Sequence, residues 1–243
     1  MNHFTYLAVN IGAILFPFIF SFHPKLKFYK TWFAFFPAMI IAASIFISAD
    51  VLFTHLGIWG FNPDYLTGIY FFNLPIEEYL FFFCIPYACI FTFHCFKILI
   101  NQSPDETTTR LISKIASVVL FVIGIFYFNH LYTSSTFIAL AIYLFITAQF
   151  NFAFSLGKFF LAYLILLIPF FICNGILTGT GLESPVVWYN NNQNLGIRLL
   201  TIPIEDFFYG LLLILLNATI YERILRSKKL RPLISSVFSK SPC

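Results

Sequence analysis

Seven apolar runs, each long enough to cross a bilayer as a helix, constrain this chain more than any other feature. Their ranges are 4–22, 31–49, 70–97, 112–130, 136–154, 159–176 and 198–221. A helix needs about 20 mostly apolar residues to cross the hydrocarbon core. The chain is 60% hydrophobic and 10% charged, whereas a soluble domain is roughly half apolar and a quarter charged. The runs therefore predict an all-α polytopic membrane protein with seven transmembrane helices.

Basic residues indicate how these helices are oriented. Thirteen of the fourteen Lys and Arg residues fall on one side of the predicted spans, and Arg198 falls on the other. Because cytoplasmic loops carry an excess of Lys and Arg, we predict an outer N-terminus and a cytoplasmic C-terminus in the cell inner (plasma) membrane. The first run has no signal-peptide cleavage features, so we expect it to be a retained span. The net charge of +4 is explained by the basic tail, and no nucleic-acid partner is expected.

An internal repeat relates the two halves of the sequence. A shift of 128 residues aligns one acidic tetrapeptide with another, and a shift of 124 aligns the segments upstream. The matched positions are Pro75-Ile76-Glu77-Glu78 with Pro203-Ile204-Glu205-Asp206, Asn62 with Asn190, Gly68 with Gly196, and Asp50 with Asn174, while Trp59 and Trp188 agree to within one position. The repeat predicts two parallel three-helix units joined by a linker helix, a 3+1+3 arrangement. The expected limits are 1–98, 99–134 for the loop and linker, 135–222, and 223–243 for the basic tail.

The two acidic tetrapeptides lie inside apolar segments, where a charge at the centre of a span costs roughly 2.5–3.5 kcal/mol. We therefore expect Glu77, Glu78, Glu205 and Asp206 to face an enclosed interior, at the interface between the repeats. Four carboxyl groups in a low-dielectric site cannot all ionise. A protonated carboxyl group beside a carboxylate supplies a general acid and a general base. The prolines predict either a helix start or a mid-span kink at the motif.

Other side chains near the motifs are candidates for binding substrate or supporting the acids. Aromatic residues crowd the motifs, and aromatic faces stabilise cations without acting as nucleophiles. These candidates are Asn62, Asn190, Asp50, Asn174, Trp59, Trp188, Arg198, Tyr79 and Phe207. In a purely structural alternative the acids pair with Arg198 or backbone groups, although one arginine cannot neutralise four acids. A proton or ion relay is a second alternative.

The Pro-x-Glu-Glu/Asp motif occurs once per three-span half and follows an outer Asp/Asn, Gly and Trp stretch. In this pattern the chain resembles the membrane-embedded lycopene cyclases, in the fused form of the two-subunit bacterial enzymes. The resemblance implies cyclisation of the linear ends of lycopene or γ-carotene to β-ionone rings without net redox. It implies proton donor and acceptor roles for Glu77, Glu78, Glu205 and Asp206, and contact with other carotenoid enzymes. No nucleotide-binding motif or metal-ligand spacing occurs, so no cofactor or metal is expected.

Two other functions fit parts of the same pattern. A carotenoid hydratase would use the same protonation but let water trap the cation. A small-solute or proton-coupled transporter would use the acids without changing a carotenoid. A rhodopsin-like photoreceptor needs a lysine in its last helix for a Schiff base, and residues 198–221 contain none.

Overall fold

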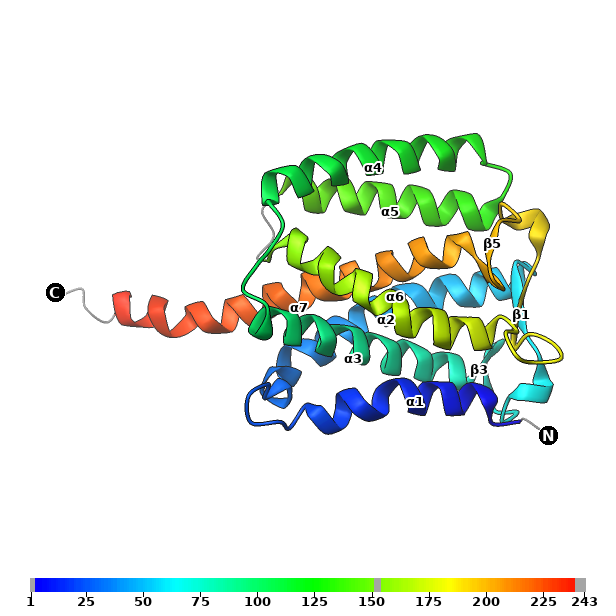
Figure 1. Ribbon diagram of the computed structural model, residues 1–243, viewed down its shortest axis with the longest axis horizontal. Coiled ribbons are helices and arrows are strands. Elements are labelled where there is room, and N and C mark those ends of the chain that lie inside the picture. Colours follow the sequence, from blue (N-terminus) through cyan, green and yellow to red (C-terminus); the bar gives the residue numbers. More distant parts are fainter. Residues whose placement is uncertain (1–2, 151–153, 239–243) are drawn as a thin grey trace.

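All seven predicted helices are present in the part of the chain that the structure describes. The computed structural model describes residues 3–150 and 154–238, with side chains described as far as residue 227. The helices are α1 (Thr5–Phe20), α2 (Trp32–His55), α3 (Ile76–Leu99), α4 (Glu106–Phe126), α5 (Leu131–Gln149), α6 (Leu156–Leu177) and α7 (Ile204–Phe238). They form one bundle with α4 and α5 along one edge and α1 along the opposite edge (Figure 1).

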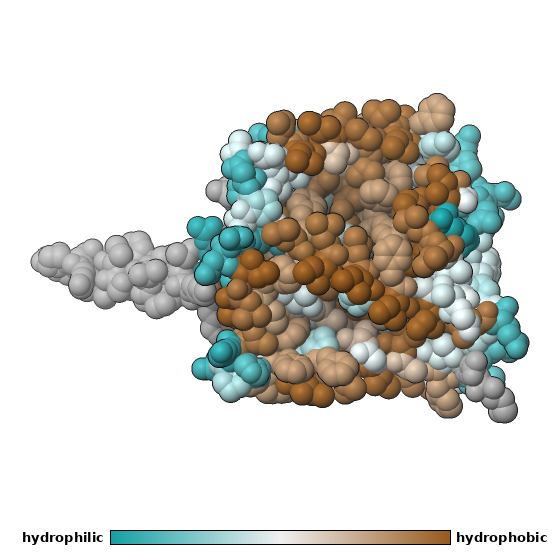
Figure 2. Space-filling model, in the orientation of Figure 1, coloured by the Kyte–Doolittle hydropathy of each residue, from teal (hydrophilic) through white to brown (hydrophobic). Residues whose placement is uncertain are grey.

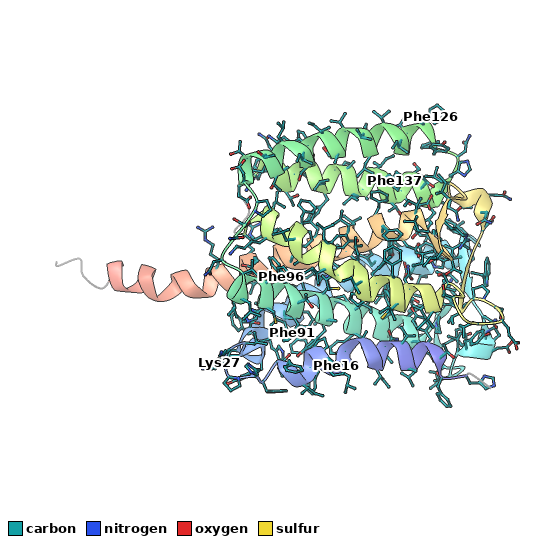
Figure 3. The ribbon with its side chains drawn as sticks, in the orientation of Figure 1. Phe16, Lys27, Phe91, Phe96, Phe126 and Phe137 are labelled. Atoms are coloured by element: carbon teal, nitrogen blue, oxygen red, sulfur yellow. The ribbon has the colours of Figure 1, made fainter. Side chains whose placement is uncertain are left out.

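The outer surface of the bundle is apolar across its middle. Among the described residues six helices are long and apolar enough to span a membrane, and α1 is an apolar helix of 16 residues. Phe16 and Phe126 are 67% and 81% exposed and lie on the outside of the bundle in Figure 3. Figure 2 shows a broad apolar band between two more polar ends. Soluble monomers rarely expose apolar patches of this extent, so the protein is membrane-embedded.

Packing between the helices follows the predicted repeat. Within each half, α1 packs on α3 and α5 packs on α7, whereas across the halves α2 packs on α7 and α6 packs on α3. Helix α4 packs mainly on α5, outside these pairs, which agrees with its predicted role as a linker. The 3+1+3 arrangement is therefore present as two interlocked units. The residue limits 1–98, 99–134, 135–222 and 223–243 stay our proposed division.

Helices α3 and α7 begin six residues later than the predicted spans, which start at residues 70 and 198, because a short hairpin precedes each helix. Strand β2 (Tyr70–Phe71) pairs with β3 (Leu74–Pro75), and β5 (Arg198–Leu199) pairs with β6 (Ile202–Pro203). Phe72 and Leu200 turn the chain with positive φ angles of 52° and 58°. Hydropathy could not distinguish these hairpins from helix, because their tips are apolar and Phe72 and Leu200 are 91% and 76% exposed.

The outer loops of the two halves pair with each other. Strand β1 (Trp59–Phe61) runs antiparallel to β4 (Val187–Tyr189), with Gly60 opposite Trp188. These two residues are equivalent at a shift of 128, so the pseudo-two-fold axis passes between them. A Cβ atom on Gly60 would lie 2.4 Å from the Trp188 ring, so a larger residue at this position would force that ring to shift. This ribbon holds the first turns of α3 and α7 at the same end of the bundle (Figure 1).

The two ends of the bundle differ in charge. The N-terminus and all six strands of the described chain lie at one end, and α7 leaves the bundle at the other (Figure 1). Lys27 lies at the end from which α7 leaves (Figure 3). At that end Lys97 of α3 forms an ion pair with Glu222 of α7. The acidic motifs are therefore at the end away from the basic loops.

Candidate active site

The acidic motifs form the first turns of α3 and α7, which answers the question that the prolines left open. Pro75 is the N-cap of α3, and Glu77 and Glu78 follow in its first turn. Glu205 and Asp206 occupy the first turn of α7. A helix start leaves backbone N–H groups without intrahelical partners and carries partial positive charge, so it favours nearby carboxylates.

The first acid of each motif is bonded to the loop that precedes it. Oε1 of Glu77 accepts the backbone N–H of Thr67 at 2.7 Å, and Oε1 of Glu205 accepts that of Leu195 at 2.7 Å. Both contacts are related by the 128-residue shift, and both glutamates are fully buried. Thr133 also donates to Oε1 of Glu205, at 2.5 Å. These acids thus secure the loops against the helix starts.

The second acid of each motif points into a shared interior space and accepts a tyrosine hydroxyl. Tyr6 of α1 donates to Oε2 of Glu78 at 2.6 Å. Tyr132 of α5 donates to Oδ1 of Asp206 at 2.6 Å. The two tyrosines are equivalent at a shift of 126 residues, and neither was a candidate from the sequence. A tyrosine near the start of the first span of each half was the available signal.

Each second acid also lies beside a polar side chain of another helix. These side chains are Asp50 in α2 and Asn174 in α6, which the repeat aligns at a shift of 124 residues. Asn174 of α6 donates from Nδ2 to Oδ2 of Asp206 at 2.8 Å. At the equivalent position in α2, Asp50 lines the same cavity as Glu78, and the two buried carboxyl groups interact electrostatically. Tyr209 donates to Oδ1 of Asp50 at 2.5 Å. The halves therefore differ chemically, since one presents two carboxyl groups and the other a carboxyl group and an amide.

Asp50, Glu78 and Asp206 line one cavity of about 70 Å³, which we call the acid chamber. Its walls carry the aromatic rings of Trp59, Phe61, Phe81, Tyr132, Tyr189 and Tyr209. Trp59 contacts Tyr132, Tyr189 and Tyr209 edge to face, with its centroid 5.0 Å from that of Tyr132. Such rings present negative faces that attract a cation and offer no nucleophile. The chamber therefore combines acids with an environment suited to a positive charge.

Tyr189, in strand β4, closes the chamber from the outer loop. Its hydroxyl donates to Oδ2 of Asp206 at 2.9 Å. Burial raises the pKa of Tyr189 well above its ordinary value, and the nearby Asp206 carboxyl group raises it further. Its hydroxyl therefore stays protonated and acts as a donor, so Asp206 accepts three hydrogen bonds in all.

Other residues predicted for the site lie outside the acid chamber. Asn62 and Asn190 cap the short helices Pro63–Tyr65 and Asn191–Gln193. Trp188 covers Gly60 and is 43% exposed.

Arg198 donates to the backbone oxygen of Thr201 and to Asn191, and contacts no acid among its described partners. Tyr79 donates to the backbone oxygen of Phe71, and Phe207 packs on Phe170 and Phe171.

The fold and the chamber define a class: a polytopic membrane protein with carboxyl groups and aromatic rings enclosed at the interface of two repeats. The chain belongs to the lycopene cyclase family, because the model of that family, described as lycopene cyclase, matches residues 3–96 and 129–224. The two matched segments correspond to α1–α3 and α5–α7, and together they cover more than half of the chain. No curated protein and no solved structure matches the chain.

Proposed function

We propose that this membrane protein is a lycopene β-cyclase, which converts the linear ends of lycopene or γ-carotene to β-ionone rings. The observation that carries the proposal is the acid chamber, where Asp50, Glu78 and Asp206 meet among aromatic rings. A hydrocarbon offers only π-bonds to react, so ring closure without redox needs a strong proton donor, a cation-tolerant cavity and a base. The family match supports a carotenoid substrate.

The Asp50–Glu78 pair is the proposed proton donor. Two buried carboxyl groups that line one small cavity repel each other when both are ionised, so the pair favours keeping one proton. That proton adds to the terminal double bond of the polyene and leaves a tertiary cation. The neighbouring double bond attacks the cation and closes the six-membered ring.

Asp206 is the proposed base. Its two oxygens accept hydrogen bonds from Tyr132, Asn174 and Tyr189, a donor set suited to a carboxylate. It takes a proton from the ring carbon next to the new cation, and the double bond re-forms inside the ring. One proton is added and one removed, so the product is an isomer of the substrate and no redox partner takes part.

The rings around the chamber support the cationic intermediate in this proposal. Trp59, Tyr209 and Phe81 present ring surfaces to the space between the acids. A cation near such a face gains about 0.5–2 kcal/mol, more where water is excluded. The same rings limit access of water, which favours loss of a proton over addition of water.

The proposed setting is the plasma membrane, with the N-terminus outside and the C-terminus in the cytoplasm. The concentration of Lys and Arg at the end opposite the acidic motifs supports this orientation. The chamber would then lie near the outer leaflet. Contact with other carotenoid enzymes, which supply the linear substrate, is part of the proposal.

Expression in a lycopene-accumulating bacterial host tests the function directly. Pigments extracted from cells with the unaltered chain are separated by chromatography and compared with cells that lack it. The proposal expects ring-bearing carotenoids of unchanged mass. Unchanged lycopene, with the protein present in the membrane fraction, would refute it, and a product heavier by one water would indicate a hydratase.

A further inference from the structure

An apolar cavity of about 100 Å³ adjoins the acid chamber on one side, and we call it the first groove. Helices α1, α3, α6 and α7 line it. Its lining includes Ala13, Ile85, Cys89, Pro169, Phe170 and Gly210. Pro169 is exposed on α6, and most of the other lining side chains are only half-buried, so the groove reaches the lipid-facing surface.

The first groove is continuous with the acid chamber. Four of the lining residues are common to both cavities: Phe81, Asn174, Gly210 and Leu213. Asn174 is the amide that donates to Asp206. A chain lying in the first groove therefore ends beside the proposed base.

The repeat produces a second cavity on the opposite side of the chamber, the second groove, between α2, α5 and α7. Its volume is about 150 Å³. The same shifts of 124, 126 and 128 residues that relate the two halves of the site also relate residues lining the two grooves. The equivalent lining pairs are Ala13 with Ala139, Phe81 with Tyr209, Pro169 with Ile45, Phe170 with Phe46, and Cys173 with Ala49.

One position breaks the equivalence of the grooves. Gly210 of α7 corresponds to Phe82 of α3 at a shift of 128, and Phe82 is buried with its ring 6.1 Å from that of Phe46 in the second groove. A Cβ atom on Gly210 would make only ordinary contacts, at 3.6 Å or more, with Tyr163 and Phe170. The missing side chain at Gly210 thus leaves the first groove open to the chamber, while an aromatic ring fills the matching position on the other side.

We propose that the first groove is the substrate site, where the linear polyene lies with one end in the acid chamber, and that the second groove is not a route to it. This inference rests on the proposed function. The occupant is a polyene hydrocarbon because the lining is apolar, the mouth faces lipid, and the inner end meets the acids. A dry cavity of roughly 150 Å³ holds a benzene-sized ring, so the chamber and the first groove together suit one six-membered end, with the remaining chain extending toward lipid.

Three substitutions to phenylalanine separate the two grooves. Gly210→Phe blocks the junction of the first groove with the chamber, and Ala13→Phe blocks the same groove from α1. Ala139→Phe is the matched control, because it fills the equivalent position of the second groove. We expect Gly210→Phe and Ala13→Phe to lower ring formation at least tenfold in the lycopene host, and Ala139→Phe to leave it unchanged. Membrane content and thermal unfolding show whether each variant folds.

A binding measurement complements the product analysis. Each substitution is combined with Glu78→Gln, which stops turnover, and the protein is placed in lipid nanodiscs with lycopene. Lycopene is achiral, so circular dichroism in its absorption band reports a polyene held in a chiral site. We expect the signal with Ala139→Phe and its loss with Gly210→Phe and Ala13→Phe.

The outcomes distinguish this inference from the proposed function. Equal dichroism and equal ring formation in all three variants would overturn the first groove as the substrate site, while ring formation by the unaltered chain would keep the function. Loss of dichroism and of ring formation in Ala139→Phe alone would assign the substrate site to the second groove and overturn the inference. Lycopene left unchanged by the unaltered chain, with dichroism that depends on Gly210, would support the site and refute the function.

Discussion

Replacing Glu78 with glutamine is expected to stop ring formation while leaving the fold intact. Glutamine keeps the shape of the side chain, and its amide oxygen can still accept the Tyr6 hydroxyl that lies 2.6 Å from Glu78. The amide cannot donate an acidic proton, so the proposed Asp50–Glu78 donor pair loses its function. The adjacent Glu77 offers a matched control, since it is equally buried in the same turn but bonds the loop at Thr67.

The expected magnitudes separate loss of chemistry from loss of fold. Removing a general acid slows a reaction by about 10²- to 10⁴-fold, which corresponds to about 3–5 kcal/mol of activation free energy. Weakening one buried hydrogen bond lowers the free energy of unfolding by about 1 kcal/mol. Glu78→Gln should therefore lower the rate of ring formation at least 100-fold while leaving the free energy of unfolding nearly unchanged.

The assay follows ring-bearing product with time in vesicles that contain equal amounts of each variant and lycopene. Glu77→Gln is expected to keep more than a tenth of the activity, because glutamine can preserve the bond to the backbone of Thr67. Comparable rates for Glu78→Gln and the unaltered chain would refute the assignment. Equal loss in both variants would show that the two acids act together.

Four further substitutions test the site and the outer ribbon. Tyr6→Phe and Tyr132→Phe each remove a donor to a buried carboxyl group and should lower the free energy of unfolding by about 1.5–3 kcal/mol, measured by denaturant titration; no change would show that these bonds are not formed. Gly60→Ala places a Cβ atom 2.4 Å from the Trp188 ring and should cost about 1–3 kcal/mol by overpacking, with a lower melting temperature as the readout; an unchanged melting temperature would show that the outer ribbon yields easily. Tyr189 has a raised pKa in the folded protein, so above about pH 10 only the unfolded chain ionises it and stability falls as pH rises. Tyr189→Phe should make that fall less steep by up to about 1.4 kcal/mol per pH unit, and an equally steep fall would contradict a raised pKa of Tyr189.

Sequence patterns predicted the helices and the relation between the halves. Spans of about 20 apolar residues require helices in lipid, so α1 to α7 follow from hydropathy. The repeated tetrapeptide at Pro75 and Pro203 predicted equivalent helices, and α3 and α7 are equivalent in their contacts. The aligned positions Asp50 and Asn174 were candidates from the repeat alone, and the structure places both beside the second acids.

Side-chain direction and long-range partners were beyond the sequence. Adjacent acids on a helix point about 100° apart, but the sequence does not say which one faces inward, and the structure turns Glu78 and Asp206 to the chamber. Tyr6 lies 72 residues from Glu78, and only the packing of α1 on α3 brings them together. The hairpins before α3 and α7 were also missed, because apolar residues at their tips resemble the start of a span.

The infrared spectrum of the carboxyl groups at neutral pH tests directly whether the Asp50–Glu78 pair holds a proton. A protonated carboxyl group has a C=O stretching band distinct from the bands of a carboxylate. We expect such a band in the unaltered protein, and its loss or shift in both Asp50→Asn and Glu78→Gln, because the proposed donor pair shares one proton. A spectrum without this band, or a band that is unchanged in both variants, would contradict a proton held ready by the Asp50–Glu78 pair.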